Sequence, residues 1–403
     1  MSYKPTNSLG VRRRDFLKFA GATTLIALKP SLGSAAPGSS PGMFRGNPTH
    51  TFYGTGPVSS LPKVVWKKQL GKFKAEGKNK IWSGTGWTGT AVADENFVYV
   101  GSLDSNLYCF YKTTGYQKWS FKAKAMFKSS PALYLNRVFI GNVDNCIYCL
   151  SSDKGKLLWK YDTGSDVDSS AVIAKGRLFI GGESGWLNCF EPTTGSLVWR
   201  TFLKGKSGKK GSDGIESTPA VYGKMVFTTN YQGDIFALNI NDGSIIWKNS
   251  TGDDTDVSPV VAAGKVFVAA EEKSPYIFAF DIATGKLIWK WGGWKTGGFW
   301  STPAYSNGCI YIGGHHGRLY CLDAHKGKEK WSFKTTRPVW SSPAVVDQKV
   351  IFGSYDGYLY LLNSTSGQMI SRINLKGRII SSPLVDRGNI YIGTANGRFY
   401  CLK

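Results

Sequence analysis

One short block of sequence recurs through most of this chain and limits its fold more than any other feature. The block reads DIATGKLIWK at residues 281–290, and near copies stand at 151–160, 191–200, 239–248 and 323–332. A period of about 40 residues indicates similar units that each bury too little to be stable alone. The chain of 403 residues is therefore expected to be a repeat array rather than two or three independent domains.

Eight units follow from aligning the residue that stands just before each block. Each unit reads SSPAV, an apolar run such as RVFIG, a Gly, Asn or Asp turn, LYCL, and then TGKLLW. Four short strands in a unit of this length are typical of a β-propeller blade. The aligned positions, spaced by 40, 40, 48, 42, 42, 40 and 40 residues, are Cys109, Cys149, Cys189, Ala237, Ala279, Cys321, Leu361 and Cys401.

The two ends of the array complement each other. The last unit ends at FYCLK (399–403), after its third strand, and the missing fourth strand stands at PKVVWKK (62–68). Joining the two would close the ring and remove an open sheet edge. The prediction is an all-β, eight-bladed propeller of four-stranded blades over residues 62–403, preceded by a lead-in segment at 36–61.

A tryptophan recurs on the predicted outermost strand, with Ser371 as the exception. Such a side chain can cover the backbone of the next blade, and the glycine four residues earlier permits a tight turn. We expect these tryptophans to pack the blades together. They are Trp66, Trp119, Trp159, Trp199, Trp247, Trp289 and Trp331.

The first 35 residues have the zones of an export signal. A basic start is followed by an apolar run from Phe19 to Leu28 and then by small residues. That run is too short to span a bilayer, which takes about 20 residues. Arg13 and Arg14 resemble a twin-arginine signal, which implies a periplasmic or extracellular protein cleaved after Ala35 or Ala36.

The chain carries a net charge of +23, which favours acidic surfaces such as anionic glycans or lipid headgroups. Solubility alone is the simpler explanation, since the lysines are scattered among turns. No motif that reads nucleic acid is present. The one long insertion, FLKGKSGKKGSDGIE (202–216), adds a basic loop that is suited to contact with a partner.

From residue 43 to the last residue, the chain resembles the pyrroloquinoline-quinone-type propeller repeat family. The TGKLLW element is similar to the tryptophan-docking motif of quinoprotein alcohol dehydrogenases. The superfamily also contains proteins without catalysis, among them the outer-membrane assembly factor BamB, which this chain matches in size and blade count. The resemblance therefore implies the fold and leaves the function open.

The residues that the dehydrogenase reading expects are not found. No two cysteines are adjacent, and no histidine follows Cys146 and Cys149 as haem attachment would need. We interpret the cysteines as small buried thiols. His315 and His316 are expected in an exposed turn, and no nucleophile is paired with a base. No catalytic residue, metal site or cofactor is predicted on this evidence.

Any ligand is expected at the central channel, lined by the residue three before the proline of each SSPA element. These positions form an acidic arc beside an apolar arc. The candidate binding residues are Trp87, Asp168, Glu216, Asp256, Trp300 and Trp340, with Lys128 and Ile380 completing the ring and Trp294 and Phe299 in support. A packed ring that merely fills the channel is the competing interpretation.

Two functions remain in view from the sequence. The first is a non-catalytic, monomeric scaffold in the periplasm or cell envelope that binds envelope proteins or other ligands, acidic glycans among them. The second is a dehydrogenase of alcohols or sugars, in which the acidic arc holds Ca²⁺ and the tryptophan arc stacks pyrroloquinoline quinone.

Overall fold

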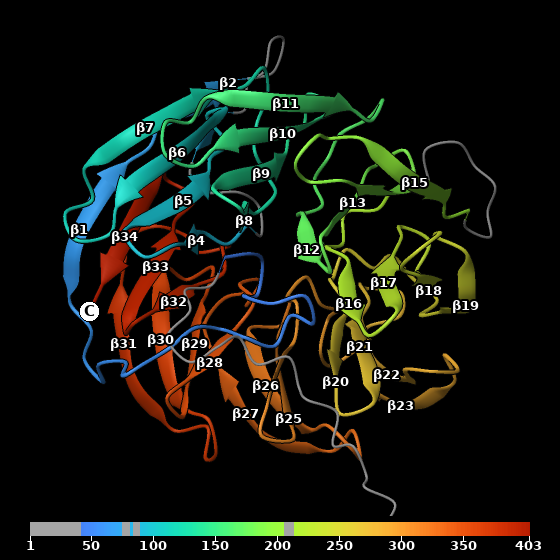
Figure 1. Ribbon diagram of the computed structural model, residues 1–403. Coiled ribbons are helices and arrows are strands. Elements are labelled where there is room, and N and C mark those ends of the chain that lie inside the picture. Colours follow the sequence, from blue (N-terminus) through green and yellow to red (C-terminus); the bar gives the residue numbers. More distant parts are fainter. Residues whose placement is uncertain (1–41, 75–80, 84–88, 205–212) are drawn as a thin grey trace, which may run out of the picture. The chain divides into compact units, whose positions relative to one another are not determined.

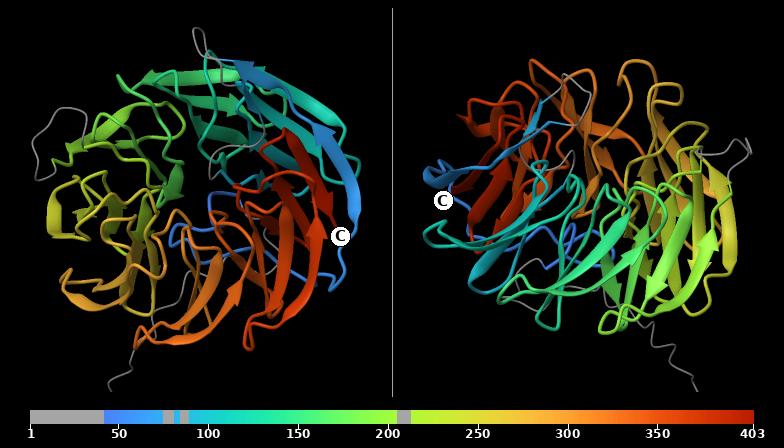
Figure 2. Two further views of the ribbon diagram at one scale, coloured as in Figure 1. Left: turned by 180° about the vertical axis from the view of Figure 1, so that it is seen from behind. Right: turned by 90° about the horizontal axis from the view of Figure 1, so that it is seen from above.

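The computed structural model describes residues 42–74, 81–83, 89–204 and 213–403, all within one compact unit, Gly33–Lys403. In these ranges the strands form eight four-stranded antiparallel sheets and one two-stranded sheet. The eight sheets follow one another around a ring in chain order (Figure 1), and Figure 2 shows the same ring from behind and from above. The predicted eight-bladed propeller is confirmed. The proposed export signal lies outside the described residues.

The first four blades lie between residues 92 and 250. Blade 1 contains β4 (Val92–Ala93), β5 (Phe97–Gly101), β6 (Asn106–Tyr111) and β7 (Gln117–Lys122). Blade 2 contains β8 (Ala132–Tyr134), β9 (Arg137–Gly141), β10 (Cys146–Ser151) and β11 (Leu157–Asp162). Blade 3 contains β12 (Val172–Ala174), β13 (Arg177–Gly181), β14 (Trp186–Phe190) and β15 (Leu197–Phe202). Blade 4 contains β16 (Ala220–Tyr222), β17 (Met225–Thr229), β18 (Asp234–Asn239) and β19 (Ile245–Ser250).

The other four blades complete the ring. Blade 5 contains β20 (Val260–Ala262), β21 (Lys265–Ala269), β22 (Tyr276–Asp281) and β23 (Leu287–Gly292). Blade 6 contains β24 (Ala304–Ser306), β25 (Cys309–Gly314), β26 (Arg318–Asp323) and β27 (Glu329–Lys334). Blade 7 contains β28 (Ala344–Val346), β29 (Lys349–Gly353), β30 (Tyr358–Asn363) and β31 (Met369–Asn374). Blade 8 contains β32 (Leu384–Asp386), β33 (Asn389–Gly393), β34 (Arg398–Leu402) and β1 (Val64–Gln69), while β2 (Lys72–Lys74) and β3 (Ile81–Ser83) form the extra hairpin.

The ring closes as the ends of the array predict. Strand β1 pairs antiparallel with β34, with Trp66 opposite Cys401, and the two strands lie side by side in Figure 1. Lys63 and Lys403 extend the ladder by exchanging backbone hydrogen bonds of 2.7 and 2.9 Å. Because β1 covers the free edge of β34, blade 8 has four strands like the other blades.

The SSPA elements hold neighbouring blades together near the axis. The backbone N–H of Ser130 donates to the Oγ of Ser170 in the next blade, and Thr302 donates in the same way to Ser342. The preceding serine instead contacts the second strand of its own blade, as Ser341 accepts from the N–H of Gly353 and Ser129 donates to the carbonyl of Gly141. Each hydroxyl thus satisfies a buried backbone group. The hydroxyl-bearing positions of this inner collar are Thr90, Ser130, Ser170, Thr218, Ser258, Thr302, Ser342 and Ser382.

The recurrent tryptophans form a second joint near the rim. In each case the indole Nε1–H donates to a backbone carbonyl of the following blade, as Trp247 does to Ile282 at 3.1 Å. The ring also covers the glycine of the next TG turn, and a Cβ built on Gly285 would lie 2.5 Å from Trp247. The glycine therefore has two roles, since it has a φ of +68° and also leaves room for the indole of the preceding blade. The same pairing joins Trp66 to Gly115, Trp119 to Gly155, Trp159 to Gly195, Trp199 to Gly243, Trp289 to Gly327 and Trp331 to Gly367.

This joint explains the exceptional Ser371. Its strand, β31, faces blade 8, which is the split blade. The third and fourth strands of blade 8, β34 and β1, are not consecutive in the chain, so a TG turn does not connect them as it does in the other blades. A tryptophan at 371 would have no glycine to cover.

A β-bulge precedes every tryptophan position. In blade 2 the register shifts between Cys149 and Leu150, so that Leu158 has no partner while Trp159 pairs with Cys149. Equivalent shifts occur in all eight blades. A bulge re-aims the side chains beside it, which here turns the indole toward the next blade and leaves the two preceding residues at the surface.

The lead-in segment, in its described part (42–61), runs along the axial ends of the inner strands, in blue in Figure 1. The backbone N–H groups of Leu133, Val221 and Val261, on β8, β16 and β20, donate to lead-in carbonyls. His50 is fully buried and contacts the carbonyl of Pro259 at 2.7 Å through Nδ1. The segment therefore seals one end of the channel.

Candidate ligand-binding cavity in the channel

A cavity of about 470 Å³ occupies the channel on the inner side of blades 2 to 6. Its floor includes Phe44, which belongs to the lead-in segment and is 4% exposed. Five carboxylates line it, together with five of the eight inner-collar residues, Ser130, Ser170, Thr218, Ser258 and Thr302. The other lining residues are Lys128, Asp168, Glu216, Tyr231, Asp254, Asp256, Glu271 and Trp300.

The structure brings together four of the six residues that the sequence predicts as ligand-binding. Asp168, Glu216, Asp256 and Trp300 all line the cavity, each at the entrance to the inner strand of its blade. Trp340 does not line it but packs on Trp300, with ring centroids 4.5 Å apart. Trp87 lies outside the described residues. Whether these residues bind a ligand stays a prediction.

A second tier of residues, missed by the sequence prediction, comes from the turns between the second and third strands. Glu183, Tyr231 and Glu271 occupy this position in blades 3, 4 and 5. Their N–H groups donate to the carbonyls of Asp166, Gly214 and Asp254, two residues before the ring position. The glycine or small residue that ends each second strand repeats from blade to blade. The position two residues after it could therefore have been used to predict these residues from the sequence.

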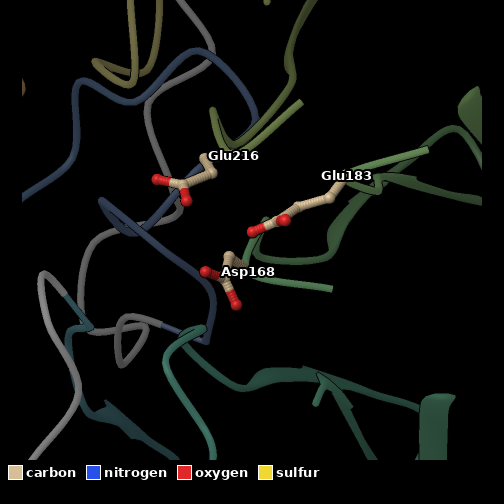
Figure 3. A group of neighbouring side chains, drawn as sticks. All are labelled: Asp168, Glu183 and Glu216. Carbon is tan, nitrogen blue, oxygen red and sulfur yellow. The ribbon is translucent and has the colours of Figure 1, made fainter. Parts of the chain in front are cut away.

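Three carboxylates meet beside Lys128. Asp168, Glu183 and Glu216 each offer an oxygen within 4.8 Å of the others, and in Figure 3 the side chain of Glu183 extends toward Asp168 and Glu216. The ammonium of Lys128 is bound to Asp168. Burial alone would lower the pKa of Lys128, but Asp168, Glu216 and Glu183 outweigh it and raise that pKa. The lysine is therefore held charged among these acids.

Three further carboxylates lie in and next to blade 5. Burial raises the pKa of Asp254 to about 6 and that of Glu271 to about 7. The pKa of Asp256 is raised well above its ordinary value by burial and by Glu216 and Asp254. Neighbouring negative charges thus add to the cost of removing each group from water.

The aromatic side of the channel runs through blades 6 and 7. The ring of His315 stands edge-on to Trp300 at 4.9 Å and to Trp340 at 6.0 Å. Only 10% of the His315 side chain is exposed, so the predicted exposed turn is correct for His316 and wrong for His315. Packing against the indoles, which the sequence pattern did not show, buries it and lowers its pKa to about 4.

The two supporting aromatic residues lie elsewhere. Phe299 is fully buried in the core between blades 5 and 6, whereas Trp294 is 75% exposed, and neither lines the cavity. The seven cysteines are all buried and unpaired by disulfides. Burial raises the pKa of Cys149, for example, to about 12, which makes it an inert thiol.

The cavity does not fit pyrroloquinoline quinone. This cofactor is a flat tricarboxylate, and the described lining offers five carboxylates against a single lysine that Asp168 already holds. A buried anion without a cationic partner is strongly disfavoured. Trp300 is a stacking surface, but it is tilted by 43° against Trp340 and does not form a flat wall with it.

Within the described ranges, no helix is long and apolar enough to cross a bilayer. Solved structures share the propeller. A europium-containing methanol dehydrogenase superposes with a TM-score of 0.76 at 14% identity, over 90% of this chain and 98% of that chain. BamB from Moraxella catarrhalis superposes with a TM-score of 0.68 at 16% identity, over 85% of this chain and 100% of that chain.

Curated relatives match over shorter stretches. The outer membrane protein assembly factor BamB of Escherichia coli is 24% identical over 114 residues, which are 28% of this chain and 28% of that protein. The quinohemoprotein alcohol dehydrogenase ADH-IIG of Pseudomonas putida is 28% identical over 143 residues, 30% of this chain and 20% of that protein. The chain thus covers less than a third of the length of these relatives.

A family model gives the broadest match. The model described as "Outer membrane protein assembly factor BamB" matches residues 62–291 and 276–370, which include most of the blades. The repeat, the closure of the ring and this match agree. The chain belongs to the family of PQQ-like propellers that this description covers.

Proposed function

We propose that this protein is exported and acts in the cell envelope as a monomeric, non-catalytic scaffold that binds other proteins. Membership of the BamB family supports this proposal, as do the relatives whose names refer to outer-membrane assembly. The net charge of +23 supports additional contact with acidic glycans or other acidic envelope surfaces.

One structural observation carries the proposal. The outermost strands of blades 2 to 5 each begin with two adjacent aliphatic side chains that are between 38% and 49% exposed, and blade 8 has a similar pair at Val64 and Val65. Single exposed apolar residues are ordinary, but pairs at one position of four successive blades form a larger apolar surface. We call this surface the apolar belt. It consists of Leu157, Leu158, Leu197, Val198, Ile245, Ile246, Leu287 and Ile288.

The belt coincides with open strand edges. Strands β11, β15, β19 and β23 each pair on one side only within the described sheets. Proteins commonly protect such edges with lysine, and blades 1 and 6 do carry Lys118 and Lys330 at the bulge position. Blades 2 to 5 carry aliphatic residues there instead. An extended segment of a partner can add to such an edge while its apolar side chains cover the belt.

Site-specific photo-crosslinking in the native host tests this proposal. A photoreactive residue at Ile246 or Leu158 is expected to capture one and the same envelope protein, whereas a residue at the exposed Glu95 in blade 1 captures none. Absence of an adduct at both belt positions contradicts the proposed surface. Replacing Arg13 and Arg14 by lysine is expected to abolish both export and crosslinking.

The dehydrogenase alternative makes a separate prediction. A quinone enzyme would change its absorbance when the cofactor and Ca²⁺ are added and would then reduce a dye with an alcohol or sugar. The crowded carboxylates of the cavity predict neither change. A stable spectral shift with dye reduction would overturn the scaffold proposal.

A further inference from the structure

The cavity contains two groups of carboxylates, and only the first has a cation of its own. Lys128 belongs to the group formed by Asp168, Glu183 and Glu216, where its ammonium is bound to Asp168. Lys128 shows how an alkyl ammonium ion is held in this channel. The alkyl chain of Lys128 extends from blade 2, and its ammonium group lies beside the carboxylates of blades 3 and 4.

The second group, Asp254, Asp256 and Glu271, has no such partner. Throughout the described part of the chain, no Lys, Arg or His nitrogen lies within 4.0 Å of its carboxylate oxygens. Asp254 and Asp256 interact with each other, and Oδ1 of each is buried without any other hydrogen-bond partner in these ranges. Buried acceptors left unpaired are costly, so such atoms indicate a missing donor.

An independent observation comes from Asp168, at the corresponding position of blade 3. Its side chain is only 5% exposed, it lines the cavity, and Oδ1 has no partner although Lys128 holds the carboxylate at Oδ2. The unpaired acceptors of Asp168, Asp254 and Asp256 therefore belong to side chains that line the same cavity. A donor with several N–H groups could serve them.

Apolar surfaces beside the second group suit a hydrocarbon chain. Trp300 lines the wall next to Glu271, and Phe44 also lines the cavity. An ammonium ion near an aromatic face gains cation–π attraction, and methylene groups gain from leaving water. The cavity of about 470 Å³ has room for a small aliphatic amine.

The spacing of the second group favours an ammonium ion over a metal. In the described residues, only Asp168, Glu183 and Glu216 have ligand atoms close enough, within 4.8 Å, to coordinate one ion together. Metal–oxygen bonds of about 2.0–2.6 Å require such closeness. Hydrogen bonds from an ammonium group are longer, about 2.7–3.2 Å, and tolerate wider spacing.

We propose that Asp254, Asp256 and Glu271, together with Trp300, form a binding site for a primary alkylammonium ion. The ammonium group of the ligand lies beside the second group in the same way that the ammonium group of Lys128 lies beside the first group. Its source is either a free aliphatic amine or a lysine side chain, since both present the same chemical group. This site is distinct from the apolar belt, so the scaffold proposal and this one can fail separately.

Isothermal titration calorimetry of the folded protein with cadaverine tests the site. We expect saturable binding of one equivalent at pH 8, and no binding of 1-pentanol, which has the chain without the charge. A lysine-containing tripeptide in a parallel titration distinguishes the two sources, because the tighter ligand identifies the natural one. Lack of saturable binding by either amine overturns the proposal, as does competitive displacement of cadaverine by Ca²⁺.

Matched variants locate the binding. Glu271→Gln with Asp256→Asn is expected to weaken cadaverine at least tenfold, while Glu95→Gln with Asp153→Asn removes the same charge at exposed positions and stays within twofold of wild type. If both double variants bind cadaverine with the same affinity, the proposed site is wrong.

Lys128→Met provides a test that does not weaken the second group. Removing the internal ammonium leaves the first group free, so the number of bound cadaverine molecules should rise from one to two. An unchanged number contradicts the proposed equivalence of the two groups.

Discussion

Trp247 covers Gly285 of the next blade so closely that a Cβ atom on the glycine would lie 2.5 Å from the indole. Seven such pairs join the blades, and each also carries a hydrogen bond from the indole to a carbonyl of the following blade. Shape and hydrogen bonding therefore select the same register between neighbouring blades.

Gly285→Ala is expected to destabilise the fold beyond the cost of its backbone conformation. Gly264 is a matched control, since its φ of +72° resembles the +68° of Gly285 but a Cβ there meets nothing within 4 Å. The alanine at 285 should cost about 2 kcal/mol more than that at 264, because the indole must shift. Chemical denaturation of both variants measures the difference, and equal losses would show that Trp247 does not restrict this position.

His50 predicts an acid-sensitive lead-in segment. Burial lowers its pKa from 6.5 to about 3, so the folded state binds the proton less readily than the unfolded state. The stability that neutral His50 contributes is present above pH 6.5 and is lost as the pH falls toward 3. Between pH 7 and pH 4 this loss should reach about 2–3 kcal/mol.

His50→Gln keeps a donor for the Pro259 carbonyl but cannot titrate. The variant should lose less stability on acidification than wild type does, whatever its stability at neutral pH. Urea unfolding at several pH values gives both slopes. Parallel slopes would mean that His50 is protonated in the folded protein without cost.

Much of this architecture could be predicted because each blade repeats the same sequence pattern of strands and turns. The strand order, the split blade and the outward tryptophans followed from period and spacing alone. The second function of Gly285 did not, since a turn glycine and a glycine covered by a neighbouring indole have the same sequence pattern. The cover comes from another blade, 38 residues earlier in the chain at Trp247.

The candidate site was predictable only in its first tier. Asp168, Asp256 and Trp300 share a repeat position beside the proline element, so the array itself pointed to the axis. Glu183 and Glu271 come from turns, and their convergence depends on how far each turn leans toward the channel. The enclosure by Phe44 depends on the path of a segment without any repeat, which spacing cannot give.

The acids of blade 5 predict that ligand-free protein is less stable at high pH. Their raised pKa values mean that the folded state holds protons that the unfolded state releases. The stability that these acids contribute is therefore fully present below pH 4 and is lost as the pH rises through about 7. The groups that face them, Glu216, Asp253 and Glu272, are also acidic and strengthen the effect.

Glu271→Gln should therefore stabilise the ligand-free protein by about 1–2 kcal/mol at pH 8 and change little at pH 5. Thermal unfolding at both pH values, with Glu95→Gln as the exposed control, measures the effect. A variant that is less stable than wild type at pH 8 would indicate that Glu271 already has a cationic partner.

The crystal structure of the protein with cadaverine, determined at pH 8, tests the central claim most directly. We expect electron density for an ammonium group of cadaverine within hydrogen-bond distance of Asp254, Asp256 and Glu271, with the carbon chain of cadaverine against Trp300. A cavity that holds only water at saturating cadaverine, or density located outside these residues, would contradict it.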